Sequence, residues 1–313
     1  MRWLDTLRSR AAQGWSAPRG TVADGPLLDS AFLTQLEYLS LRVARSGTTG
    51  FAGEHPSRRK ASSVEFADYR DYRPGDDFRL IDWNVYARLG ELTLRLTEAS
   101  ESTTLHLLLD CSASMAWGTP SKFRAAQRLA AALGCIALSR YDSVRLGILR
   151  GTEAQAMPRL RGKNSVPRLL AILDDLKPEG VLDLAAATGY YCRTTRRGVS
   201  VLIGDLLAPS GTGEAAAALR RAGLATTVVQ ILAPEEQTPA LEGPLDLIDC
   251  ETGQKVITAV NAEMLRLYRQ RFDSWTADLQ EQCAGQQVAF VRCFADQPLQ
   301  DMLFSALCGQ VLQ

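Results

Sequence analysis

The sequence predicts an α/β fold in which a mostly parallel, doubly wound sheet is flanked by helices. From residue 101 onward, short apolar segments rich in β-branched residues alternate with longer helical patterns, and crossovers between parallel strands produce this alternation. Several of the short segments are almost continuously apolar, which is typical of strands buried on both faces. We therefore expect one covered sheet to occupy most of the chain after residue 100.

The individual elements follow from hydrophobic periodicity and from the positions of turn residues. Thr252 and Gly253 are expected to form the turn of a strand pair. Strands are expected at 91–110, 143–150, 154–160, 199–205, 225–232 and 288–294, and the strand pair at 245–260. Helices are expected at 121–140, 165–176, 182–195, 213–222, 261–284 and 298–312.

The chain before residue 101 is expected to form two segments. Residues 1–26 contain Gly, Pro, Ser and scattered arginines with little periodicity, which predicts a flexible N-terminal arm. Residues 27–100 begin with leucines at helical spacing, so a helix is expected at 27–46. A basic loop, a motif rich in Asp and Arg, and a strand follow it. We expect this second segment to pack against the α/β domain of residues 101–313.

Composition and charge exclude several classes of protein. The 35 basic and 35 acidic residues leave no net charge, whereas nucleic-acid binders usually need a basic excess to neutralise phosphates. No apolar run approaches the roughly 18 residues that span a bilayer, and the N-terminus lacks the apolar core of a secretory signal. The seven cysteines include no C-x-x-C pair, which disfavours disulfide frameworks and zinc sites. A cytoplasmic protein without a transmembrane segment is therefore expected.

Two of the expected strands end in an aspartate. Asp110 follows the apolar run LHLLL and opens an Asp-x-Ser-x-Ser pattern with Ser112 and Ser114, and Asp205 ends the strand at 199–205. Ligands of doubly wound sheets bind at the carboxyl ends of the strands, and carboxylate and hydroxyl oxygens suit a hard cation such as Mg²⁺. These four residues are the predicted ligands of a divalent cation. The alternative is that Asp110 only caps the local backbone.

A second motif, between residues 64 and 90, interleaves carboxylates with arginines and aromatic residues. Arginine pairs bidentately with carboxylates, so the motif predicts a packed ion-pair network over an aromatic floor. The arginines also lower the pKa of nearby carboxyl groups, which disfavours acid–base catalysis. The residues singled out for the network are Glu65, Arg73, Asp76, Asp77, Arg79, Asp82, Trp83 and Arg88.

The acidic pattern resembles the metal-ion-dependent adhesion site of von Willebrand factor A domains. In that family the Asp-x-Ser-x-Ser residues, a later threonine and a final aspartate hold the cation, and a partner's carboxylate often completes its coordination. Asp110, Ser112, Ser114 and Asp205 match the pattern. The resemblance implies a von Willebrand factor A-like fold and a metal site that binds a partner protein.

The threonine of that pattern has no counterpart in this chain. Val181 and Leu182 stand near its expected place, and neither side chain can donate an oxygen. Asp183 or a water molecule is expected to take over the position, or else the site holds no metal.

The Asp/Arg motif, with the preceding Gly-Glu-His of residues 53–55 and the basic run of residues 57–60, closely resembles the bacterial domain-of-unknown-function family 58. Members typically pair this motif with a von Willebrand factor A-like domain, and a late hairpin at residues 247–253 also looks like theirs. The resemblance covers about residues 28–305. It implies an adaptor or regulator that works with a MoxR-type AAA+ ATPase in the assembly or maturation of complexes.

The function expected from these patterns is a metal-dependent protein-binding adaptor that is not an enzyme. The alternatives are a metal-dependent hydrolase, in which the cation activates water, and a metal-free interaction scaffold. No catalytic or cofactor-binding residue is predicted, because the chain has no G-x-S-x-G elbow and no P-loop. The only histidines are His55 and His106, and His106 is expected to be a core residue.

Overall fold

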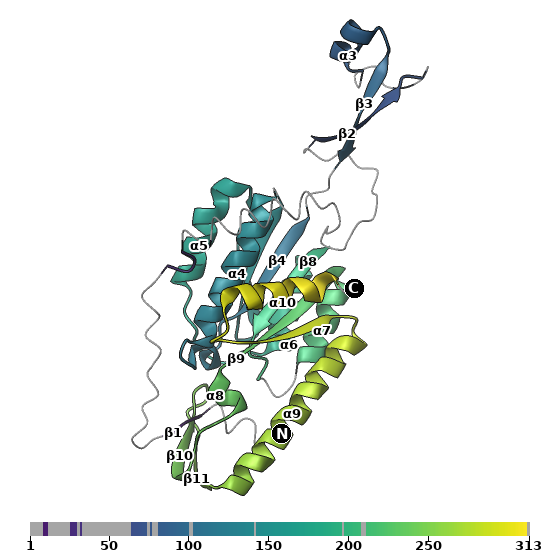
Figure 1. Ribbon diagram of the computed structural model, residues 1–313. Coiled ribbons are helices and arrows are strands. Elements are labelled where there is room, and N and C mark those ends of the chain that lie inside the picture. Colours follow the sequence, from purple (N-terminus) through teal and green to yellow (C-terminus); the bar gives the residue numbers. More distant parts are fainter. Residues whose placement is uncertain are drawn as a thin grey trace. The chain divides into compact units, whose positions relative to one another are not determined.

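The computed structural model describes residues 9–11, 26–29, 32, 64–73, 76, 81–99, 103–140, 142–195, 197–207 and 211–311. The chain divides into two compact units. The larger unit comprises Met1–Gly53 and Thr104–Gln313, and the smaller unit comprises Glu54–Thr103. The larger unit contains the main sheet and its helices (Figure 1).

The larger unit contains a seven-stranded sheet with the order β12-β9-β8-β4-β5-β6, in which β7 also pairs with β5. The five strands from β12 to β5 run parallel, whereas β6 and β7 are antiparallel to β5. This mostly parallel sheet confirms the predicted α/β class. The strands are β4 (Thr104–Asp110), β5 (Ser143–Arg150), β6 (Glu153–Ala156), β7 (Leu160–Arg161), β8 (Gly198–Gly204), β9 (Leu224–Leu232) and β12 (Ala289–Phe294).

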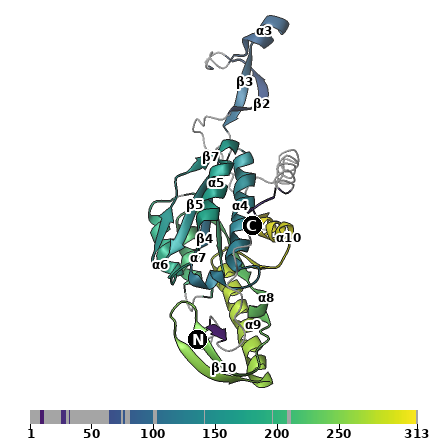
Figure 2. The same ribbon diagram turned by 90° about the vertical axis from the view of Figure 1, so that its left-hand side faces the viewer.

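Helices cover both faces of this sheet (Figure 2). One face packs against α4 (Lys122–Ser139), α5 (Val166–Asp175) and α10 (Leu299–Val311). The other packs against α6 (Leu184–Arg193), α7 (Thr212–Arg221) and the C-terminal part of α9 (Ala262–Gly285). All six helices lie close to their predicted positions. In the part of the chain that the structure describes, no helix is long and apolar enough to cross a membrane.

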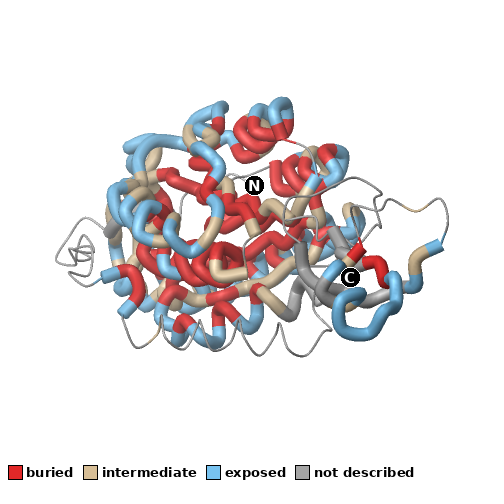
Figure 3. Tube along the Cα trace, turned by 90° about the horizontal axis from the view of Figure 1, so that it is seen from above, coloured by how far each residue is buried: buried red, intermediate tan, exposed pale blue. Residues whose placement is uncertain are grey.

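The main sheet has a hydrophobic core on each of its two faces, because successive residues of a strand point to opposite faces. In β4, Leu105, Leu107 and Leu109 pack with α4, whereas Leu108 packs with α6 and α7. All four leucines are buried, which explains why the sequence of this strand is continuously apolar. Figure 3 shows buried residues running through the interior of the larger unit.

A hairpin stands apart from the main sheet. Its strands are β10 (Gly243–Asp249) and β11 (Lys255–Val260), and its turn contains Thr252 and Gly253, as predicted. A short strand β1 (Ser9–Ala11) pairs with β10 in antiparallel register. These three residues fall within the segment predicted as a flexible arm; most of that segment, and most of the predicted helix at 27–46, lie outside the described residues.

The smaller unit contains β2 (Val64–Asp71), α3 (Trp83–Leu89) and β3 (Thr93–Ala99), with β2 and β3 antiparallel. The prediction of one strand over residues 91–110 is therefore wrong. β3 pairs with β2, whereas β4 pairs with β5 and β8. The polar residues at 100–103 separate two strands that belong to different units.

His106 lies in the interior of β4 and has the core role predicted for it. Its side chain is 3% exposed, Nδ1 is hydrogen-bonded to the hydroxyl of Tyr191 at 2.8 Å, and the two rings meet edge to face. Burial lowers the pKa of His106 from 6.5 to about 4, because the interior disfavours the imidazolium ion. The histidine is therefore neutral at physiological pH.

The first prediction concerns the pH dependence of stability. Between pH 6.5 and 4 the unfolded chain protonates this histidine but the folded chain does not. Stability is therefore lost as pH falls through this window, by about 3 kcal/mol in total. In urea unfolding at a series of pH values, His106→Gln should be less sensitive to pH than the wild type within this window. Parallel pH profiles for the two proteins would contradict the assignment.

Candidate functional site

The candidate site lies where the carboxyl ends of β4 and β8 meet. Asp110 is the last residue of β4 and Asp205 directly follows β8, and the two strands are parallel neighbours in register up to Leu109 and Ile203. The chain continues from β4 to β5 on one side, while β8 lies on the other. Such a reversal of strand order opens the crevice in which doubly wound sheets bind ligands.

The turn after β4 brings the predicted residues together. The backbone N–H of Ser112 donates to Asp110 Oδ1 at 2.8 Å, and the hydroxyls of Ser112 and Ser114 are hydrogen-bonded to each other at 2.9 Å. Ser114 lies in a short 3₁₀ helix, Ala113–Ala116, which directly follows this turn. Asp110, Ser112, Ser114 and Asp205 are all 5% exposed or less. The oxygen donors predicted from the sequence therefore converge in one buried place.

Gly204 makes the close approach of the two strand ends possible. A Cβ atom at this position would lie 2.8 Å from Asp110 Cβ and 2.9 Å from Asp110 Oδ2. The Asp110 carboxylate thus occupies the space that any larger residue at 204 would fill. Sequence reasoning missed this glycine, although its place immediately before a strand-terminal aspartate is a usable signal.

Lys122 and Glu236 complete the site and were also missed. Lys122 is the first residue of α4, and its Nζ donates to Asp205 Oδ2 at 2.8 Å and to Glu236 Oε1 at 2.5 Å. Glu236 lies in the short helix α8 (Pro234–Gln237). The Lys122 side chain is fully buried, so its charge is balanced inside the protein by two carboxylates.

The electrostatics of the two aspartates differ. Burial and the nearby charge of Asp205 raise the pKa of Asp110 from 3.8 to about 7. Burial would also raise the pKa of Asp205, but the charge of Lys122 and hydrogen bonds from Lys122 and Ser114 lower it instead. Burial opposes the charge of Lys122, and the attraction of Asp205 and Glu236 raises its pKa above the ordinary value. Of the two aspartates, Asp110 is therefore the one whose charge is less compensated.

The loop at the expected threonine position lies against the Asp-x-Ser-x-Ser turn. The N–H of Ala113 donates to the carbonyl of Gly180 at 2.8 Å, and the N–H of Glu179 donates to the carbonyl of Cys111 at 2.8 Å. Val181 is 48% exposed and contributes no oxygen from its side chain. The loop therefore reaches the site through its backbone.

Asp183, the predicted substitute for the threonine, caps a helix. Its Oδ1 accepts a hydrogen bond from the N–H of Ala186 at 2.9 Å at the start of α6, and the residue is exposed. The capping bond competes with metal coordination for this carboxylate. That Asp183 is a ligand of the cation stays a prediction.

The donor set fits a hard cation with a small number of protein ligands. In the described residues, no three His, Cys, Asp or Glu side chains come together as a metal-binding group. The candidate set instead combines the carboxylates of Asp110 and Asp205 with two serine hydroxyls. Mg²⁺ commonly binds proteins through one or two carboxylates and retains several waters, so these donors suit it.

In the smaller unit, two residues of the Asp/Arg motif shape the backbone. The N–H of Arg73 donates to Asp76 Oδ2 at 2.8 Å, and the N–H of Asp76 donates to the carbonyl of Arg73 at 3.0 Å, which closes a turn. The N–H of Val85 donates to Asp82 Oδ1 at 3.3 Å at the start of α3. These aspartates stabilise a turn and a helix start, and the ion-pair network stays a prediction.

The aromatic floor predicted for this motif is wrong at Trp83. Its side chain is 59% exposed and meets the ring of Tyr86 edge to face at 6.1 Å. Trp83 opens the short helix α3 with Tyr86 one turn later, so the two rings share one helix face. Of the remaining network residues, Glu65 lies in β2, Arg88 is exposed near the end of α3, and Asp77 and Arg79 lie outside the described residues.

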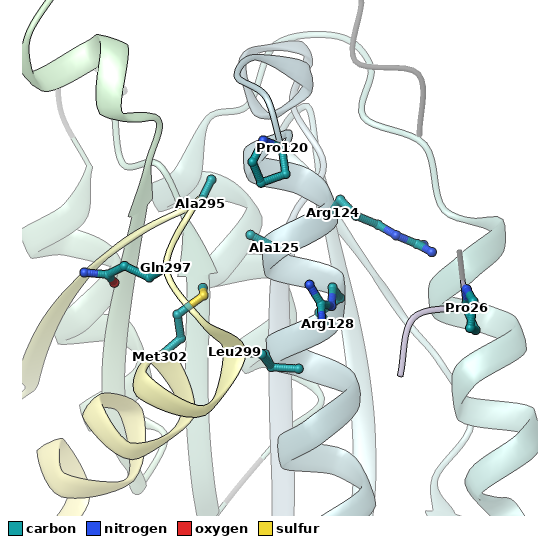
Figure 4. A pocket seen from close by; sticks show the side chains of 9 residues that line it. All are labelled: Pro26, Pro120, Arg124, Ala125, Arg128, Ala295, Gln297, Leu299 and Met302. Carbon is teal, nitrogen blue, oxygen red and sulfur yellow. The ribbon is translucent and has the colours of Figure 1, made fainter. Parts of the chain in front are cut away.

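A separate cavity of about 260 Å³ lies between α4 and the start of α10. Figure 4 shows Arg124 and Arg128 beside mostly apolar lining residues, which include Leu299 and Met302. Arg124 is already paired with Asp174 at 2.7 Å. None of the predicted metal ligands lines this cavity, so the acidic site is distinct from it.

Comparison with known proteins assigns the family. A family model described as "Protein of unknown function DUF58" matches residues 68–282. The chain belongs to this family. The match begins inside the Asp/Arg motif and extends over the acidic site into α9, which confirms the family predicted from these two patterns.

A curated relative agrees with this assignment, and two solved structures are similar to the chain at low identity. The uncharacterized protein Rv1480 of Mycobacterium tuberculosis is 30% identical over 243 residues, which cover 75% of this chain and 74% of the relative. BatB from Bacteroides thetaiotaomicron has a TM-score of 0.41 at 16% identity and covers 67% of this chain and 98% of its own. The SpRpn10 VWA domain has a TM-score of 0.37 at 12% identity, with 64% and 93% covered. The second of these structures is a von Willebrand factor A domain.

The second prediction follows from the raised pKa of Asp110. Between pH 3.8 and about 7 the folded carboxyl keeps a proton that the unfolded chain releases, so stability is lost as pH rises through this window. Asparagine keeps the acceptor oxygen without the charge. In the presence of a chelator at pH 8, Asp110→Asn should be more stable than the wild type by up to about 4 kcal/mol in urea unfolding.

The control for this prediction is Asp183→Asn, because asparagine caps helices as well as aspartate does. That exposed substitution should leave stability nearly unchanged at both pH 5 and pH 8. An Asp110→Asn protein that is less stable than the wild type at pH 8 would mean that the ionised carboxylate is well solvated in the fold.

Proposed function

We propose that this protein is a protein-binding adaptor whose contact site is the acidic end of β4 and β8. A divalent cation such as Mg²⁺ is held by Asp110, Ser112 and Ser114, with Asp205 beside it, and an Asp or Glu of the partner completes its coordination. The observation that carries the proposal is the convergence of two buried aspartates and two buried serines at the ends of neighbouring parallel strands.

The charge of the site supports a cation. Asp110 and Asp205 repel each other in the interior, and this repulsion contributes to the raised pKa of Asp110. A divalent cation between such groups would favour their ionised forms. The neighbouring hydroxyls of Ser112 and Ser114 offer neutral oxygens, which complete the coordination without adding charge.

Catalysis is not part of the proposal. Metal-dependent hydrolysis needs a group that accepts a proton from the attacking water. Among the described residues the sole histidine is His106, which lies four positions before Asp110 on β4 and is hydrogen-bonded to Tyr191 in the core. In the proposal the cation instead acts as a bridge to a partner protein.

We also propose a MoxR-type AAA+ ATPase, or a client of it, as the partner. The support is the family, because members resembling this chain are often associated with such ATPases. A metal bridge suits this role, since it makes recognition depend on a single carboxylate placed correctly on the partner.

A metal-free scaffold is the second candidate, and one observation favours it. Lys122 already places a positive charge against Asp205, and the threonine position offers no side-chain oxygen. As a metal-free scaffold, the protein would use the buried acidic site to stabilise its fold, and the partner would bind elsewhere on the surface.

The third prediction separates the two candidates. In calorimetric titration, the wild type should bind Mg²⁺ or Mn²⁺ saturably and Asp110→Asn should not, because the variant removes the aspartate carboxylate whose charge is not balanced by Lys122. Asp183→Asn serves as the control and should bind like the wild type unless Asp183 is a ligand. No binding by the wild type at millimolar metal would favour the scaffold.

The fourth prediction concerns the partner. An immobilised wild-type protein should retain a purified MoxR-type ATPase of the same genome in Mg²⁺ buffer, and Asp110→Asn should retain at least about tenfold less. Comparing variants in one buffer is necessary because the ATPase itself uses Mg²⁺. Equal retention by both proteins would show that any contact bypasses the acidic site.

A further inference from the structure

Lys122 is the part of the acidic site that cation coordination does not explain. Its side chain is 0% exposed, and its ammonium donates to Asp205 Oδ2 at 2.8 Å and Glu236 Oε1 at 2.5 Å. A fully buried ammonium persists only where paired carboxylates replace its hydration. The three residues therefore form a built ion triad inside the larger unit.

Three separate elements meet in this triad. Lys122 begins α4, Asp205 follows β8, and Glu236 belongs to α8. The second oxygen of Glu236 accepts a hydrogen bond from the N–H of Ala233 at 2.8 Å, and the hydroxyl of Tyr268 donates to the Glu236 carbonyl. Glu236 is thus fixed from two sides, and it fixes the ammonium beside Asp205.

The helix itself gives no reason for a positive charge at this position. A positive charge in the first turn of a helix opposes the helix dipole, and Lys122 stands at the start of the 18-residue α4. Apolar residues of similar volume often replace buried ion pairs without loss of stability. The reason for an ammonium at this point therefore lies in the charge balance of the site.

Lys122 offsets part of the negative charge of the site. Asp110, Asp205 and Glu236 each contribute a negative charge when ionised, the charge of Glu251 also acts on Asp110, and Lys122 contributes one positive charge. Without Lys122 the site would be more negative, and it would attract a divalent cation more strongly.

We propose that Lys122 is the resident counter-cation of the acidic site: it holds Asp205 against Glu236 and limits the affinity of the site for a divalent cation. This inference rests on the function proposed above. In the free protein the metal binds weakly, and a partner's carboxylate restores the negative charge that Lys122 removes. Metal and partner therefore bind cooperatively, and Lys122 is a positioning residue that sets the strength of this coupling.

The test measures thermal unfolding in a chelator and at increasing MgCl₂, which gives an apparent metal affinity from the shift in Tm. Lys122→Met keeps the volume and removes the charge. It should lower Tm in the chelator by on the order of 10 °C and raise the apparent Mg²⁺ affinity by at least about tenfold. Glu236→Gln should weaken the affinity, because it removes a negative charge. Lys177→Met, at an exposed lysine, is the matched control and should resemble the wild type.

A purely structural role for Lys122 predicts a different result. In that case Lys122→Met lowers Tm equally in the chelator and in Mg²⁺, with an unchanged apparent affinity, and the proposal is overturned. If Lys122→Met does not fold in either condition, Glu236→Gln decides, because an unchanged or higher affinity in this variant also overturns the proposal.

The outcomes also separate this inference from the proposed function. If MgCl₂ raises the Tm of Lys122→Met but not that of the wild type, the metal-dependent function is contradicted. The role of Lys122 in limiting metal affinity is then supported. A wild type that responds to Mg²⁺, beside variants whose apparent Mg²⁺ affinity equals that of the wild type, supports the metal-dependent function and overturns the role of Lys122.

Discussion

The structure depends on holding two like charges next to each other in its interior. Parallel neighbours β4 and β8 end at the same edge of the sheet, so the aspartates that follow their apolar runs are brought together. Interiors penalise such an arrangement. The fold offsets part of the penalty at Asp205 with an ammonium, while Asp110 keeps a pKa raised to about 7. Residues kept at a cost to stability are common at functional sites.

Other features of the fold follow from this contact. The last residue of β8 has to be Gly204, because the carboxylate of Asp110 lies where a side chain would be. Helix α4 begins with a charged residue although most of its remaining residues are buried. The short helix α8 has to lie within reach of that charge. A site of four oxygen-donating residues is thus linked to a strand end, a helix start and a short helix that are far apart in the sequence.

The sequence was a good guide to the fold and to half of the site. Periodicity located the helices and strands of the larger unit, because their apolar residues face the core at regular spacing. The rule that ligands bind at carboxyl strand ends brought Asp110 and Asp205 together correctly.

Contacts between residues far apart in the sequence could not be predicted from periodicity or local motifs. Lys122 begins an Ala-rich helix, where a lysine ordinarily faces solvent, and its partner Glu236 is 114 positions away. Local patterns contain no signal for an ion pair of this span. The error at 91–110 has a similar origin, since alternation and apolar runs both predict strands but do not say which strands they pair with.

The short strands at one edge of the main sheet have a consequence for the behaviour of the protein in solution. β6 contains four residues and β7 contains two, and both pair with β5 in the antiparallel sense. Open strand edges invite pairing with other chains, and very short edge strands offer few backbone groups for it. The parallel strands are therefore shielded on this side from edge-to-edge aggregation.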